Sequence, residues 1–277
     1  MFDFLLLFTY PFVIRALIVG IAVAISSSSL GSFLVLKKYS MIGDGLAHVS
    51  FMAIALALVL NQSILWISLP IVTLASMVIM RLNENANIHG DAAIGLISSF
   101  SIAVGTIIIS MARGFNIDID NYLFGSILLI QNADVILAVV VAILIATIVI
   151  LFYPQLFMMT FDEEFARVNK IKTKWFNYLL AALTSITIII GIRAVGTLLI
   201  SSLIIFPTII ALQITRGFKA TILTSVILSI AFIIIGFIVS FAFDWPTGST
   251  IVVINGIAFL AIYLTKNIRN LTIRRTA

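Results

Sequence analysis

Apolar runs of about 20 residues recur along the whole sequence, each near the length at which a helix crosses the ~30 Å hydrocarbon core of a bilayer. The runs are continuous, whereas the strands of a transmembrane barrel alternate apolar and polar residues. Of the 277 residues, 62% are hydrophobic and only 10% are charged. A soluble domain carries about 25% charged residues. The sequence therefore predicts an all-α fold, a polytopic bundle of transmembrane helices.

Breaks at Pro, Gly and charged residues divide residues 1–277 into spans of a single transmembrane domain. We expect nine spans, at 12–36, 43–60, 63–80, 91–112, 134–153, 176–192, 195–213, 219–242 and 249–265. Only Arg193 and Ala194 separate 176–192 from 195–213, so one span followed by a broken helix is the alternative, which leaves eight. The run 121–130 is too short to cross and is expected to be re-entrant or interfacial.

The basic residues predict the orientation of these spans. If the loop at Lys37 is cytoplasmic, alternating crossings place all 16 lysines and arginines on that side except Arg15, Arg113 and Arg193. Basic residues near span ends favour the cytoplasmic side. We expect a cytoplasmic C-terminus and, with nine spans, an N-terminus outside. The net charge of +5 follows from this distribution, and it indicates no binding of nucleic acid.

Asp44 and His48, in SMIGDGLAHVSF, are the ionisable pair within a predicted span. Residues i and i+4 share a helix face, and ionisable groups inside a membrane are functional candidates. A carboxylate and an imidazole together suit a divalent cation such as Zn²⁺ or Mn²⁺. Two ligands are too few for a structural zinc site, which takes four, whereas a transport site is incomplete and reversible. The alternative is that Asp44 caps the helix and His48 bonds to it.

Four further polar residues are candidates for a cation pathway. Asp118 and Asp120 lie in the external loop GFNIDIDNY, where they could attract cations or form an ordinary solvated loop. Ser201 and Ser202 lie between Gly196 and Pro207. A helix broken there would line a cavity with these serines, whereas an ordinary proline kink would carry no function.

The longest cytoplasmic loop, at 154–175, contains FDEEFARVNKIKTKW. Its acidic residues Asp162, Glu163 and Glu164 suit a helix N-terminus, and the lysines that follow suit the membrane face. Such a helix on the cytoplasmic surface would be a docking site for a partner protein. The alternative is a solvated loop that only connects two spans. The chain has no G-x-x-x-x-G-K-[ST] motif with which to bind ATP.

Seven stretches, in order, resemble the integral membrane permease of zinc and manganese ABC importers, the ZnuB-like family. They are YPFVIRALIVG, LKKYSMIGDGLAHVSF, GDAAIGLISS, NYLFGSIL, FDEEFARVN, VGTLLISSLIIFP and DWPTGST. Two positions depart from the family pattern. Met52-Ala53 stands where members often have Gly or Pro-Gly, and Lys170 stands where many have Gly. These departures affect helix packing beside the metal residues and the end of the loop helix.

The resemblance implies a permease of the plasma membrane that moves a divalent metal unchanged, with no catalysis and no permanently bound cofactor. It implies four partners: a second copy of this chain in a homodimer, a separate cytoplasmic ATPase, an extracytoplasmic metal-binding protein and membrane lipid. Asp44 and His48 become the favoured metal residues, and 161–170 becomes the helix that docks on the ATPase, through Asp162, Glu163, Glu164, Phe165 and Arg167. The form GDGLAHVSF favours zinc over manganese. The alternatives are an ion- or proton-coupled secondary transporter without an ATPase, and a scaffold subunit.

Overall fold

The computed structural model describes residues 10–85, 89–111 and 130–276. Within these ranges the chain is helical and contains no strand, as predicted. The helices are α2 (Pro11–Leu36), α3 (Ile42–Val59), α4 (Ile64–Asn85), α5 (Gly90–Met111), α7 (Asn132–Leu151), α8 (Tyr153–Phe161), α9 (Glu163–Val168), α10 (Thr173–Val195), α11 (Thr197–Ile214), α12 (Phe218–Phe243) and α13 (Thr247–Thr276).

Nine of the described helices, all except α8 and α9, are long and apolar enough to cross a membrane. Their bounds lie close to the nine predicted spans. The chain breaks between α10 and α11 at Gly196, whose φ of 84° favours glycine. Helix α11 then continues through Pro207 to Ile214. The separation of these two spans is therefore set by Gly196 and not by the proline. Most of the short run 121–130 lies outside the described residues.

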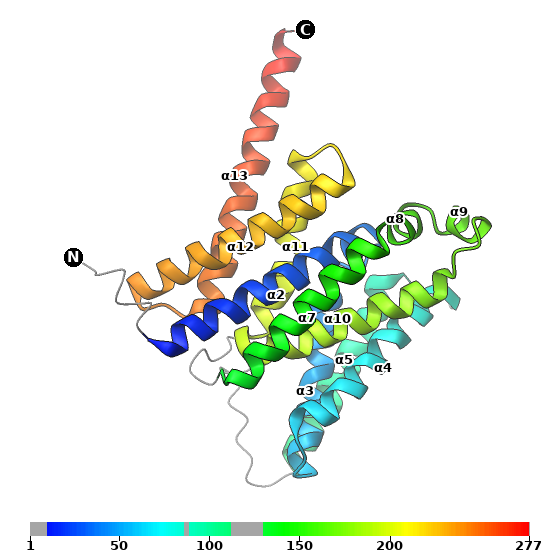
Figure 1. Ribbon diagram of the computed structural model, residues 1–277, viewed down its shortest axis with the longest axis vertical. Helices are drawn as coiled ribbons and strands as arrows, with labels where there is room; N and C mark the ends of the chain where they lie inside the picture. The colour runs from blue at the N-terminus through cyan, green and yellow to red at the C-terminus, as the bar shows by residue number, and fades with distance from the viewer. Residues whose placement is uncertain (1–9, 86–88, 112–129, 277) are drawn as a thin grey trace.

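Helix α2 is the centre of the bundle. It packs against α7, α10, α11 and α12, and Figure 1 shows it between α12 and α7. Helices α3, α4 and α5 form a second group beside these helices. The C-terminal end of α13 extends away from the rest of the bundle. The serine run of α2 (26–29) is buried, and Gly31 allows α2 to approach the backbone of Ile204 in α11. Small residues permit such close packing of membrane helices.

Polar contacts distinguish the two ends of the bundle. At one end Lys37, directly after α2, donates a hydrogen bond to Asn177 near the start of α10. At the other end of α10, Arg193 lies 3.5 Å from Asp134 in the first turn of α7, and Arg15 donates to the carbonyl of Ile130. Arg15 and Arg193, two of the three basic residues that the charge bias does not place on the cytoplasmic side, thus each have a polar partner on a neighbouring part of the bundle. The third, Arg113, lies outside the described residues.

Candidate metal site and coupling surface

The candidate metal site begins with the tight connection from α2 to α3. Lys38 takes a positive φ of 62°, and the backbone N–H of Tyr39 bonds back to Leu34. The Tyr39 hydroxyl accepts a hydrogen bond of 2.6 Å from Asn83 of α4. Its ring lies against Gly90 at the start of α5, where an added Cβ would come within 3.0 Å. The first turn of α3 is therefore held by α2, α4 and α5 together.

Asp44 and His48 lie on one face of α3, as their spacing predicts. The imidazole Nε2 is 3.6 Å from the carboxylate Oδ2. Both residues are partly exposed, whereas the residues directly beside each of them on α3 are buried. Two ligands of a tetrahedral zinc ion at about 2.1 Å lie roughly 3.4 Å from one another. The spacing of the two side chains therefore fits a pair of metal ligands without rearrangement of the helix.

The pair by itself makes a partial site. Among the described residues there is no group of three or more His, Cys, Asp or Glu side chains that could hold a metal. The position that caps α3 belongs to Met41, which makes no side-chain cap hydrogen bond, and Asp44 lies inside the first turn. A carboxylate there also interacts favourably with the helix dipole. The geometry thus allows a metal ligand that also stabilises its own helix.

The two candidate serines of α11 lie in different surroundings. Ser201 is partly buried and packs against Gly43, where a Cβ would lie 3.3 Å from its hydroxyl. Ser201 is thus brought to the same turn of α3 as Asp44. Ser202 is buried and accepts a hydrogen bond of 3.2 Å from Asn255 of α13. Ser202 therefore joins α11 to α13, a role that sequence reasoning missed because Asn255 is 53 residues away.

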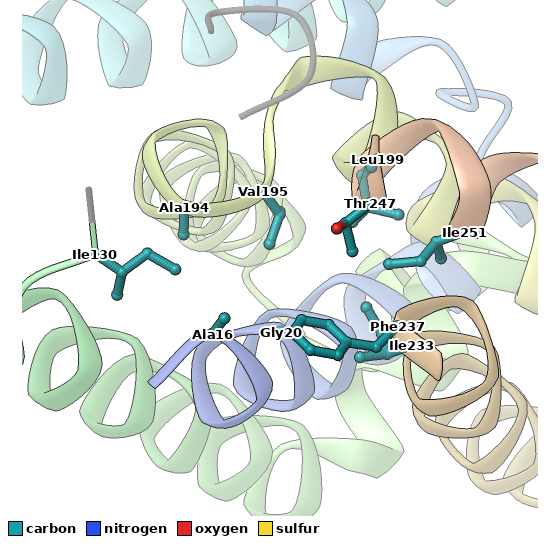
Figure 2. Close-up of a pocket in the computed structure, with 11 residues that line it drawn as sticks. Ala16, Gly20, Ile130, Ala194, Val195, Leu199, Ile233, Phe237, Thr247 and Ile251 are labelled. Atoms are coloured by element: carbon teal, nitrogen blue, oxygen red, sulfur yellow. The ribbon is translucent and has the colours of Figure 1, made fainter. Parts of the chain in front are cut away.

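A small cavity of about 20 Å³ lies beside the break between α10 and α11. Figure 2 shows Ala194, Val195 and Leu199 on one side of it, with Ala16 of α2 and Thr247 of α13 nearby. The described residues that line it include no carboxylate and no imidazole. The volume is enough for about one water molecule. The described lining of this cavity therefore offers no second pair of metal ligands.

The predicted coupling loop folds into two short helices. Helix α8 follows α7 directly, with Pro154 in its first turn. Asp162 then caps α9, because its carboxylate accepts a hydrogen bond of 2.9 Å from the backbone N–H of Phe165. This confirms the short helix predicted within 161–170 and the placement of acidic residues at its N-terminus.

The five coupling candidates point in two directions. Asp162, Glu164 and Phe165 are exposed, and Phe165 retains 55% of its accessible surface. Glu163 points toward the bundle, where its carboxylate lies 2.7 Å from Arg167 and 3.7 Å from Lys37. The exposed face therefore combines an acidic group with an apolar ring, whereas Glu163 is half-buried and pairs with Lys37 and with the exposed Arg167.

The electrostatics of Glu163 follow from this network. Partial burial raises the pKa of Glu163, but the hydrogen bond from Arg167 and the charge of Lys37 outweigh it and hold that pKa below its usual range. Lys37 also bonds to Asn177 of α10. The network thus ties α9 to the end of α2 and the start of α10. Sequence reasoning missed Lys37 and Asn177, because their contacts are more than 100 residues apart along the chain.

Asp118 and Asp120 lie outside the described residues. Their interpretation as a cation-attracting loop stays a prediction.

The family model that describes sequences of the ABC 3 transport family matches residues 9–266 of this chain. The manganese import system permease protein ScaB of Streptococcus gordonii is 30% identical over 254 residues, covering 92% of this chain and 91% of that protein. The high-affinity zinc uptake system membrane protein ZnuB of Haemophilus influenzae is 30% identical over 246 residues, covering 88% and 94%. The structure of PsaBC from Streptococcus pneumoniae in complex with Fab contains a chain with a TM-score of 0.81 and 29% identity, covering 93% and 92%.

Proposed function

The chain belongs to the ABC 3 transport family and is the membrane permease of a metal-ion ABC importer, not an enzyme; from this premise, we propose that Asp44 and His48 bind a divalent transition-metal ion in transit. Zinc is the favoured cargo and manganese the second candidate. The observation that carries the proposal is the convergence of one carboxylate and one imidazole, 3.6 Å apart and partly exposed, in the first turns of a membrane span.

The choice of zinc depends on the imidazole. Imidazole nitrogen suits zinc, whereas an all-oxygen ligand set suits manganese. The relatives bear names of both kinds, since ScaB is named for manganese and ZnuB for zinc. We therefore favour zinc because His48 supplies an imidazole ligand. Direct measurement of uptake decides between zinc and manganese.

Transport requires partners that this chain does not contain. We expect two copies of this chain, a cytoplasmic ATPase that docks on α9, and an extracytoplasmic protein that delivers the ion. The exposed Phe165 and Glu164 support α9 as the docking surface. The network from Glu163 through Lys37 would carry movement of α9 to the connection that positions Asp44. We therefore expect the Lys37 end, and with it the C-terminus, on the cytoplasmic side of the plasma membrane.

Uptake of radioactive zinc and manganese tests the cargo. Cells that express this chain with its ATPase and binding protein should accumulate zinc, and manganese should compete at higher concentration. A catalytically inactive ATPase is the control and should abolish uptake. Uptake of manganese with no uptake of zinc would overturn the preferred cargo. Metal uptake that persists with the inactive ATPase would instead support the secondary-transporter alternative.

A further inference from the structure

A long groove runs along the outside of the bundle between α7 and α12. Helix α2 packs extensively against both of these helices, whereas α7 and α12 make little or no contact with each other. Ile25 and Ser29 of α2 form the floor, Ala146 and Ile150 of α7 one wall, and Leu223 of α12 part of the other. Ser29 and Ala146 are too small to fill the space. The groove therefore remains open, with a volume of about 570 Å³.

The position of the groove makes lipid its natural neighbour. Ile150 and Leu223, at its rim, retain 73% and 62% of their accessible surface. Both belong to helices that are long and apolar enough to span a membrane. Lining residues of α12 extend from Lys219 to Val226, about 10 Å along the helix at 1.5 Å per residue. An acyl chain has the shape and the chemistry to occupy such a groove.

The groove ends at a basic residue. Lys219 lines its mouth, and its ammonium lies 5.0 Å from the centre of the Tyr153 ring. No described carboxylate forms an ion pair with it. The exposed Arg216 lies three residues earlier, in the turn between α11 and α12. Lys219 therefore lies at the end of an apolar groove, Arg216 precedes it closely in the chain, and neither has an anionic ion-pair partner among the described residues.

The start of α12 adds to this positive end. Its N-cap residue is Gly217, which has no side chain to bond the N–H groups of the first turn. Uncapped N–H groups at a helix start favour anions, phosphate included. Phe218 packs edge-to-face against Phe33 near the end of α2. The mouth of the groove is thus at the same end of the bundle as Lys37 and α9.

We propose that this groove binds an anionic glycerophospholipid, with one acyl chain between α7 and α12 and the headgroup phosphate at Lys219. The apolar length accounts for the chain, and the charge of Lys219 with the uncapped start of α12 accounts for the selection of an anionic headgroup. Under the proposed orientation this lipid belongs to the cytoplasmic leaflet, whose anionic lipids attract basic residues near the membrane surface. The binding site itself goes beyond the transport function and does not depend on which metal is carried.

Lipid retention by the purified full-length chain tests the proposal. Native mass spectrometry would count the lipids retained after incubation with phosphatidylglycerol or phosphatidylcholine of identical acyl chains. The wild-type chain should retain the anionic lipid more strongly, by about fivefold if one basic residue near the headgroup accounts for the selection. Lys219→Ala should remove this preference. Ala146→Phe, which fills the groove and leaves the charge, should reduce retention of both lipids.

The controls separate the two halves of the site. Lys174→Ala removes an exposed charge at the start of α10, outside the groove lining, and should retain lipid like the wild type. Leu223→Trp fills the groove from the opposite wall and replaces Ala146→Phe if that variant does not fold. Equal retention of both lipids by the wild type would overturn the anionic selection. A loss with Lys219→Ala but none with either filled groove would overturn the acyl-chain site.

Discussion

Gly31 is a residue at which α2 packs directly against the backbone of α11. A Cβ at this position would overlap the backbone carbonyl oxygen of Ile204, which cannot move aside as a flexible side chain would. Gly31→Ala should therefore separate the two helices and lower the midpoint of thermal unfolding in detergent. Gly95→Ala is the matched control, because nothing lies within 4 Å of its added Cβ. Its midpoint should stay equal or rise, since alanine favours helix over glycine by about 1 kcal/mol. Equal melting of both variants would contradict the close approach.

For single residues, the sequence predicts contacts between residues close together in the chain well. It predicts contacts between residues far apart in the chain poorly. Asp44 and His48 share a face because the helix repeat alone brings residues i and i+4 together. The inward direction of Glu163 depends on Lys37, at the end of a helix more than 100 residues earlier. The bond from Asn255 to Ser202 likewise joins two helices. Such contacts follow from packing of the whole bundle, which no local pattern encodes.

Helix α9 has an outward face and an inward face, and the two should respond differently to substitution. Glu164→Lys reverses an exposed charge and should reduce the amount of ATPase that co-purifies, while the thermal midpoint of the permease stays unchanged. Glu163→Gln removes the carboxylate that pairs with Arg167 and Lys37, so it should lower protection of α9 from hydrogen exchange. Full co-purification and normal transport by the Glu164→Lys variant would argue against this face as the docking surface.

The Glu163 network should also depend on pH. The pKa of Glu163 is lowered in the folded chain, because the pairing with Arg167 and Lys37 outweighs partial burial. A lowered pKa stabilises the fold above the unfolded value, about 4.3, and this contribution is lost as the pH falls through the folded value. The wild type should therefore melt above Glu163→Gln at pH 7, and the difference should shrink as the pH falls below about 4. A difference that grew in acid would contradict the assignment.

The elements themselves were largely predictable. Nine apolar runs predicted the nine span-length helices found among the described residues, because the thickness of the hydrocarbon core sets the length of a span and its apolar interior requires apolar side chains. Helix α8 was missed as a separate element, although Pro154 in its first turn is a typical helix start. Between α10 and α11 the sequence left one span and a broken helix as an alternative. The positive φ of Gly196 settles the break at that residue.

For the whole molecule, orientation in the membrane is the testable consequence of the charge distribution. The chain has no cysteine, so single cysteines can report which side they face. Gln62→Cys, exposed between α3 and α4, should react with an impermeant thiol reagent in intact cells. Lys172→Cys, exposed before α10, should react only after permeabilisation. The reverse pattern of labelling would overturn the proposed orientation.

The central claim is that Asp44 and His48 hold the metal during transport, and uptake by an Asp44→Asn permease tests it most directly. This variant keeps the size of the side chain but loses its negative charge, and with it both the anionic metal ligand and the favourable interaction with the helix dipole. Asp91→Asn is the matched control, since it removes an acidic residue from the first turn of the neighbouring span α5. His48→Gln tests the second ligand.

Mutation of residues that only contact the ligands of a metal site typically lowers metal affinity or activity by about 10–100-fold. Loss of a ligand itself should be at least as severe. We predict that Asp44→Asn and His48→Gln lose zinc and manganese uptake by at least about 10-fold while they still insert and bind the ATPase. Asp91→Asn should transport like the wild type. Near-normal metal uptake by a well-expressed Asp44→Asn permease would contradict the account.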